Sequence, residues 1–175
     1  DLPLAGRHNV ENCLWALALV EPWIEPRHAA QLLVGFQGLP HRFESLSGPT
    51  GIRCINDSKA TNVGATLAAL EGFARDGTLI LIAGGDSKHA DLAPLGEVMR
   101  GRAQLLVTLG QDAAALNEAA SASGVLWRQV ATMEEAVSTA FEHAKAGDTV
   151  LLSPACASLD TVSYTHLTLP TIVDV

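Results

Sequence analysis

Short apolar runs alternate with helix-like stretches through most of the chain, and this alternation limits the fold more than any other feature. Five apolar runs of strand length lie at residues 52–56, 78–83, 104–109, 125–130 and 149–153. Helix-like segments separate them, near residues 62–72, 92–100, 112–122 and 133–146. Strands that alternate with helices, and that are apolar on both faces, form parallel sheets covered by helices on each side. The sequence therefore predicts a doubly wound, Rossmann-like α/β domain with a mostly parallel sheet.

A helical segment of a different kind precedes this domain. Residues 8–20 and 27–36 carry apolar side chains at helical spacing, and Pro26 suits the first turn of the second helix. A stretch rich in glycine and proline follows at residues 35–40, which is typical of a hinge or a domain boundary. Further along, Thr132 and Glu135 form a capping box that starts a helix, and a glycine at position 147 suits its end.

Composition excludes several classes of protein. The 175 residues are 48% hydrophobic and 17% charged, so the chain can bury a core. A net charge of −8, without any basic run, argues against a binder of nucleic acids or anionic membranes. We expect Cys13, Cys54 and Cys156, which are scattered along the chain, to be buried. The scattered cysteines and the lack of a long apolar span indicate a soluble protein of a reducing compartment. The chain begins without methionine, so we interpret it as a fragment.

Polar loops follow the predicted strands. Their sequences are NDSKATN, GGDSKHAD, GQD and SPACASLD. In open α/β sheets ligands bind beyond the carboxyl ends of the strands, so these loops should meet at one edge. The helix after Asn62 would aim its amide groups at the same edge, which favours an anion.

Each loop taken alone permits a second interpretation. NDSKATN is also an ordinary turn that caps a helix, although such a turn does not need Lys59. GGDSKHAD lacks the GKS/T ending of a P-loop and is a weak phosphate cradle. The pair His41-Arg42 is either a solvated pair at a loop or the source of a guanidinium contact to phosphate. The stretch SPACASLD is either a turn that leads into a packed helix or a site for a carboxylate. The other histidines show no metal-ligand spacing, and we interpret Trp15, Trp23 and Trp127 as packing residues.

The motifs are more specific as a set, in the order GLPHRFE, NDSKATN, GGDSK and GDTVLLSPACASLD. The set resembles the C-terminal part of the Mur ligases, in the branch that adds D-glutamate. Neighbouring branches tend to carry an Asp-Tyr-Ala-His type of loop in place of NDSKATN. The resemblance implies a three-domain, ATP-dependent ligase of peptidoglycan synthesis. In such an enzyme ATP and Mg²⁺ convert the alanyl carboxylate of UDP-N-acetylmuramoyl-L-alanine to an acyl phosphate, which the amine of D-glutamate then attacks.

The resemblance also implies a domain organisation. Residues 1–37 would be the last helices of the central ATP-binding domain, and residues 38–161 the glutamate-ligase domain. The P-loop and the ligands for Mg²⁺ would lie in the missing part, so no metal ligand is expected here. The fragment alone is therefore expected to be inactive. The parent is expected to be a cytoplasmic monomer that acts on small molecules, without nucleic acid or membrane insertion.

Roles for individual residues follow from the same resemblance. ATP would contact Asn9, Asn12, Arg42 and Asp57, the last through its ribose. The reacting groups would have His41, Arg42 and Lys59 as neighbours. D-Glutamate would be held at its side-chain carboxylate by Thr61 and Lys88, and at its α-carboxylate by Ser158 and the backbone of Leu159. A dicarboxylate needs a cation at one end and hydroxyl or amide donors at the other, which agrees with these roles.

Two further expectations complete the sequence-based picture. After Asp160 the pattern of the family is lost, and residues 162–175 resemble the translation of a sequencing-library adapter, so we interpret this tail as an artefact.

The rival function is a free-standing Rossmann-like nucleotide-binding or regulatory module. Its supporting feature is the strand–helix alternation, although no GxGxxG follows the first strand.

Overall fold

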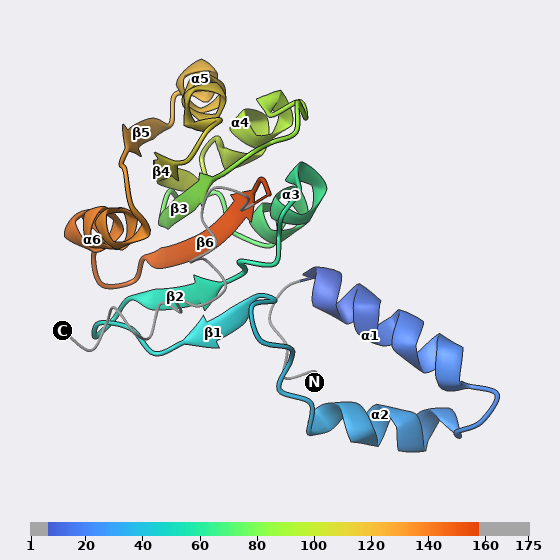
Figure 1. Cartoon of the computed structure of the whole chain (residues 1–175). Helices are drawn as coiled ribbons and strands as arrows, with labels where there is room; N and C mark the ends of the chain where they lie inside the picture. The colour runs from blue at the N-terminus through green and yellow to red at the C-terminus, as the bar shows by residue number, and fades with distance from the viewer. Residues whose placement is uncertain (1–6, 158–175) are drawn as a thin grey trace.

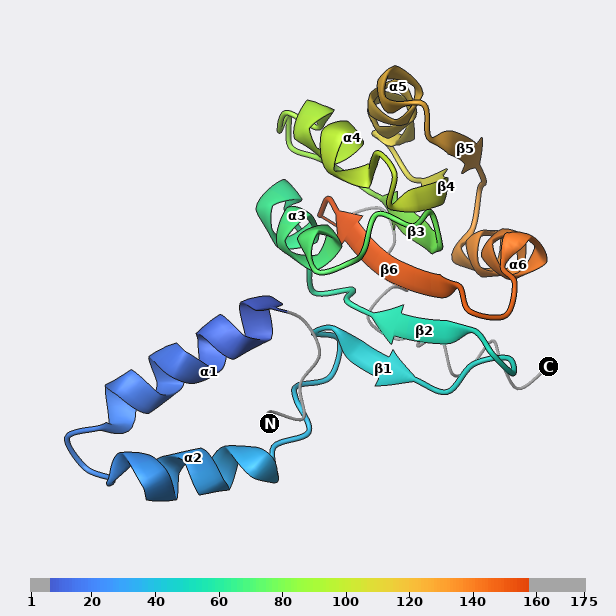
Figure 2. The ribbon, with the colours of Figure 1, turned by 180° about the vertical axis from the view of Figure 1, so that it is seen from behind.

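The computed structural model describes residues 7–157, which form a helical hairpin followed by an α/β domain (Figure 1). The hairpin consists of α1 (Arg7–Val20) and α2 (Pro26–Val34), with Pro26 in the first turn of α2. Figures 1 and 2 show this hairpin standing to one side of the sheet. None of the described helices is both long and apolar enough to cross a bilayer.

The sheet of the described region has six strands in the order β1-β2-β6-β3-β4-β5. Their bounds are β1 Glu44–Leu46, β2 Arg53–Asn56, β3 Leu79–Gly84, β4 Ala103–Leu109, β5 Leu126–Gln129 and β6 Thr149–Ala155. Only β1 runs antiparallel to its neighbour, and the other pairs are parallel. The prediction of a mostly parallel sheet is confirmed.

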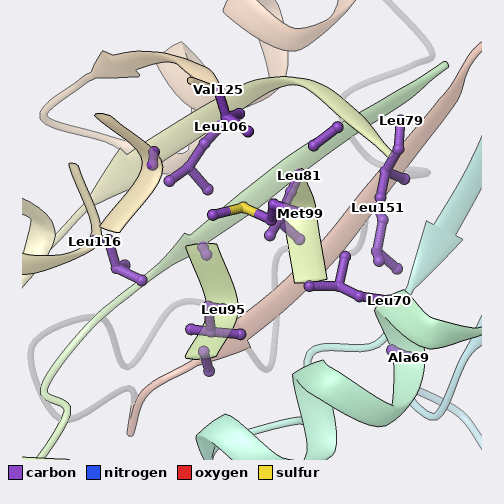
Figure 3. Close-up of a cluster of buried hydrophobic side chains, with 14 of the residues drawn as sticks. Ala69, Leu70, Leu79, Leu81, Leu95, Met99, Leu106, Leu116, Val125 and Leu151 are labelled. Carbon is purple, nitrogen blue, oxygen red and sulfur yellow. The ribbon is translucent and has the colours of Figure 1, made fainter. Parts of the chain in front are cut away.

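Helices cover both faces of the sheet, as predicted for a doubly wound fold. They are α3 (Val63–Glu71), α4 (Ala93–Met99), α5 (Ala113–Ser123) and α6 (Met133–His143). One buried cluster joins α3, α4 and α5 to the face of β3 that carries Leu79 and Leu81 (Figure 3). A second cluster joins α6 to the opposite face, which carries Ile80 and Ile82. Successive side chains of a strand point to opposite faces, so β3 must be apolar along its whole length to supply both cores.

The edges of the sheet depart from the sequence-based expectation. The run at 125–130 was expected to be buried, but every residue of β5 is exposed, and Leu126 is 68% exposed. An edge strand has a neighbouring strand on one side only, and β5 packs against α5 while its own residues stay exposed. The three-residue strand β1 was not predicted, because a segment so short carries no usable period. These corrections leave the central strands as expected.

The last helix ends earlier than predicted. The segment 133–146 forms α6 only as far as His143, and Ala144 is already extended. The start at Thr132 is confirmed, since its hydroxyl accepts a hydrogen bond from the backbone nitrogen of Glu135 at 3.2 Å. The Glu135 carboxylate reaches back to the nitrogen of Ala131 at 2.8 Å, one residue before the position that a standard capping box uses.

Packing of the tryptophans was predicted wrongly for the hairpin. Trp15 and Trp23 are 71% and 80% exposed, because the described chain supplies little else for these helices to pack against. Trp127 is 39% exposed and donates a hydrogen bond from Nε1 to Ser121. The expectation for the cysteines is confirmed, because Cys13, Cys54 and Cys156 are all buried and free.

Candidate functional site

The loops at the carboxyl edge of the sheet are joined by backbone hydrogen bonds. Asp86 and Ala157 exchange two, at 2.8 and 2.7 Å, which ties the loop after β3 to the end of β6. The nitrogen of Ala155 donates to the carbonyl of Ala60 at 2.9 Å, which ties β6 to the loop after β2. The predicted gathering of these loops at one edge is therefore confirmed for the described residues.

An aspartate holds the GGDSK loop in place. Both the nitrogen and the hydroxyl of Ser87 donate to Oδ2 of Asp112, at 2.7 and 2.6 Å. The nitrogen of Lys88 donates to Oδ1 of Asp86 at 2.8 Å. Lys88 and His89 adopt left-handed backbone with φ of 52° and 62°, and both are exposed. The loop therefore presents Lys88 on an anchored backbone, with its side chain at the surface.

Two titratable groups beside this loop have shifted pKa values. Hydrogen bonds from the side chain and backbone of Ser87 lower the pKa of Asp112, and the nearby His89 adds to this effect. Burial raises the pKa of the Cys156 thiol to about 11, and the carboxylates of Asp112 and Asp86 add to that rise. The edge is thus favourable for a carboxylate at Asp112 and unfavourable for a thiolate at Cys156.

The raised pKa of Cys156 should make the fold sensitive to alkali. Between its ordinary value of 9.0 and about 11 the unfolded chain loses the thiol proton while the folded chain retains it. The unfolding free energy should therefore fall as pH rises through this window. Denaturant titrations at rising pH should show a steeper loss for the parent than for Cys156→Ala. Equal slopes would contradict the prediction, since the other cysteines are common to both proteins.

The NDSKATN loop combines exposed cationic and buried acidic groups. Lys59 and Thr61 are exposed, and Asn62 caps α3 through a 2.9 Å bond from the nitrogen of Ala65. Asp57 is only 8% exposed. Its Oδ1 accepts from the nitrogen of Phe43 at 3.1 Å, and its Oδ2 accepts from the hydroxyl of Ser153 at 3.0 Å. Asp57 thus bonds the segment before β1 to the end of β6.

The segment that contains His41 and Arg42 is held against this loop. His41 and Phe43 have positive φ of 64° and 52°, an uncommon conformation for residues other than glycine. The carbonyl of His41 accepts from the nitrogen of Lys59 at 3.0 Å, and its ring Nδ1 lies 3.0 Å from Nδ2 of Asn56. The contacts made around these positive-φ residues hold Arg42 between them, with an exposed guanidinium.

A cavity of about 500 Å³ lies between the helical hairpin and the start of the α/β domain. Asn9 and Asn12 of α1 line it, together with Arg42 and the neighbouring Phe43. Leu33, Phe36 and Leu39 add an apolar wall. Amide groups, a guanidinium and an apolar wall are the combination that a heteroaromatic group bearing phosphates requires.

The structure brings the predicted residues together in part. Asn9, Asn12 and Arg42 share the cavity, and His41 is bonded to Lys59 through the backbone. Asp57 does not line the cavity, but it bonds to Phe43, which does. Ser158 and Leu159 lie outside the described residues, and so does the tail at 162–175. The ligand contacts assigned to all these residues stay predictions.

Sequence reasoning missed the residues that support the site. Asp112, Asn56 and Ser153 each hold a loop or a side chain in place, but none was singled out. Asp112 lies in the GQD loop, whose place after a strand was recognised. Its partner Ser87 is 25 positions away, a separation that local sequence patterns do not register.

The described residues contain no cluster of candidate metal ligands. Within 7–157 no three His, Cys, Asp or Glu side chains are grouped so that they could hold a metal ion. We therefore assign no metal ligand in this part of the chain and derive no step through a metal.

The family follows from comparison with known proteins. Residues 41–156 match the family described as Mur ligase, glutamate ligase domain. The chain belongs to this Mur ligase family. It is 55% identical to the UDP-N-acetylmuramoylalanine–D-glutamate ligase of Nitrosococcus oceani over 160 residues, which are 91% of the chain and 35% of that relative. The ligase of the same name from Escherichia coli K12 is 47% identical over 161 residues, 91% of the chain and 36% of the relative. The chain thus spans about a third of these Mur ligases.

Solved structures show the same fold. MurF from Acinetobacter baumannii aligns with a TM-score of 0.74 at 20% identity, over 99% of this chain and 39% of MurF. The UDP-N-acetylmuramate–alanine ligase MurC from Thermotoga maritima aligns with a TM-score of 0.70 at 18% identity, over 89% of the chain and 36% of MurC. The arrangement of the sheet and its helices is therefore that of the C-terminal part of Mur ligases.

Proposed function

We propose that this chain is the amino-acid-receiving part of an ATP-dependent ligase that joins D-glutamate to UDP-N-acetylmuramoyl-L-alanine in peptidoglycan synthesis. The observation that carries the proposal is its identity of 46–55% to ligases of that name, over more than nine-tenths of its length. These relatives favour a ligase over a free-standing regulatory module.

The cavity between the hairpin and the α/β domain supports a nucleotide site. Asn9 and Asn12 supply amide donors and acceptors that suit an adenine edge. Arg42 supplies a fork of donors that suits phosphate oxygens. In this proposal ATP lies across the boundary between residues 1–37 and the following domain, so that each part contributes contacts.

The carboxyl edge of the sheet supports a dicarboxylate site. Lys88 provides an anchored cation, and Thr61 provides a hydroxyl at the start of α3. Ser158 and Leu159 complete the proposed D-glutamate site from beyond the described residues. With both carboxylates held, the amine is left free to attack an acyl phosphate, and holding the reactants in this orientation lowers the barrier. His41, Arg42 and Lys59 would neighbour the reacting groups.

The proposal places the remaining machinery elsewhere in a longer protein. The chain matches about a third of its ligase relatives. In this proposal the P-loop and the groups that hold Mg²⁺ belong to the rest of the parent. Bound Mg²⁺ would neutralise phosphate charge there. We further propose that the parent acts as a monomer in the cytoplasm.

A direct assay tests this proposal. The source locus would be cloned with its upstream coding sequence, and the protein assayed with ATP, D-glutamate and UDP-N-acetylmuramoyl-L-alanine. The longer protein should form the amide product and release phosphate. The 175-residue chain alone should form none above background, because it lacks the groups that make the acyl phosphate. Product from the isolated chain would contradict the proposal that the acyl phosphate is made by the rest of the parent. A longer protein that forms no product would contradict the proposed function.

A further inference from the structure

Asn56, the first residue of the NDSKATN loop, is bonded to the ring of His41, and the orientation of its side-chain amide follows from its two partners. It is the last residue of β2 and is 1% exposed. One side-chain atom lies 3.1 Å from the backbone nitrogen of Ser58. A backbone N–H only donates, so this atom is the amide oxygen Oδ1. The other atom is therefore Nδ2, which lies 3.0 Å from Nδ1 of His41.

This orientation decides the protonation of the His41 ring. An amide nitrogen only donates, so Nδ1 of His41 must accept and carry no proton. In a neutral imidazole the proton then lies on the other nitrogen, Nε2. We propose that Asn56 is a positioning residue that holds His41 in the neutral Nε2–H tautomer, so that His41 acts as a hydrogen-bond donor and not as a general base.

The backbone of His41 is held as firmly as its ring. Its nitrogen donates to Oε2 of Glu44 at 2.9 Å, and its carbonyl accepts from the nitrogen of Lys59 at 3.0 Å. With the ring bonded to Asn56 as well, three contacts fix the residue, one from Glu44 of β1 and two from the NDSKATN loop. The residue is half-buried.

The tautomer limits the chemistry that His41 can perform. A nitrogen that already carries a proton has no lone pair with which to remove one from an amine. Protonation at Nδ1 would break the bond to Asn56. A neutral N–H donor instead suits an anionic oxygen, such as that of a phosphoryl group. This last role rests on the proposed function, whereas the tautomer itself does not.

Nitrogen NMR of the uniformly ¹⁵N-labelled 175-residue chain tests the assignment. The spectrum is recorded at alkaline pH, where histidines are neutral. The chain has six histidines, so the His41 signals are identified by their loss in His41→Gln. In the parent chain Nδ1 should resonate as an unprotonated ring nitrogen and Nε2 as a protonated one. A protonated Nδ1 in the parent would overturn the proposal without any variant at position 56.

A charge-matched pair of variants tests whether Asn56 is the cause. In Asn56→Asp a carboxylate, which only accepts, replaces the donor, so the proton of His41 should shift to Nδ1. Asn62→Asp makes the same chemical change at an exposed helix cap and should leave His41 as in the parent. A folded Asn56→Asp chain with unchanged His41 signals would overturn the proposal. These readings need no substrate, so a longer protein without ligase activity would refute the proposed function while leaving the tautomer assignment intact.

Discussion

Replacing Gly84 with alanine should destabilise the chain more than the same change at any other glycine of the described region. Gly84 ends β3 with a φ of 149°, and a β-carbon built there would lie 1.8 Å from the carbonyl oxygen of Leu109. That oxygen already accepts from the nitrogen of Gly85 at 3.1 Å within the parallel pairing of β3 with β4. Two central strands would have to separate, so we expect a loss of more than about 4 kcal/mol in the free energy of unfolding.

A matched glycine provides the control. Gly77 also has a positive φ, of 71°, but nothing lies within 4 Å of a β-carbon placed there. Gly77→Ala should therefore cost only the left-handed backbone penalty, about 1–2 kcal/mol. Urea unfolding followed by circular dichroism would compare the two variants with the parent. Equal stabilities of the two variants would show that the backbone contact at Leu109 does not decide the outcome.

Removing the Lys88 ammonium should chiefly weaken the binding of D-glutamate in the longer protein. The backbone of Lys88 is anchored through Asp86, and the neighbouring Ser87 is bonded to Asp112. In the proposed function the ammonium pairs with the distal carboxylate of D-glutamate. If bound D-glutamate desolvates this pair, losing one member costs on the order of 2–5 kcal/mol, because the other charge is left without its partner. Lys88→Ala should therefore raise the D-glutamate concentration for half-saturation by roughly 30-fold to several thousand-fold.

Two variants separate this effect from general damage. His89→Ala changes the adjacent exposed residue, which has the same left-handed backbone, and should saturate with D-glutamate like the parent. Arg42→Ala should damage the ATP-dependent step instead of D-glutamate binding, because Arg42 lines the proposed ATP cavity. Acyl-phosphate formation without D-glutamate should survive in Lys88→Ala and fail in Arg42→Ala. Normal saturation of Lys88→Ala, or its loss of acyl phosphate, would refute the role of Lys88.

The interior of the fold could be predicted from sequence, because the residues within each segment determine whether that segment is buried. The run Leu79–Gly84 is apolar at every position, and a strand buried on both faces requires that pattern. The same holds for the capped start of α6 at Thr132, where the two partners are three residues apart. The gathering of the polar loops at one edge could be predicted too, since parallel strands bring their carboxyl ends to the same edge. The exposure of β5 did not follow, because its position at the edge depends on strand order.

The resemblance identified residues that would touch ligands, whereas the supporting contacts became visible only in three dimensions. Lys88 stands out in its loop, but Asp112, which anchors the neighbouring Ser87, looks like an ordinary residue after a strand. Asn56 and His41 are 15 positions apart and belong to separate motifs. Sequence patterns report the burial and periodicity that each segment requires. Hydrogen bonds between loops depend on strand order, register and backbone direction, and for this chain only the tertiary structure decided them.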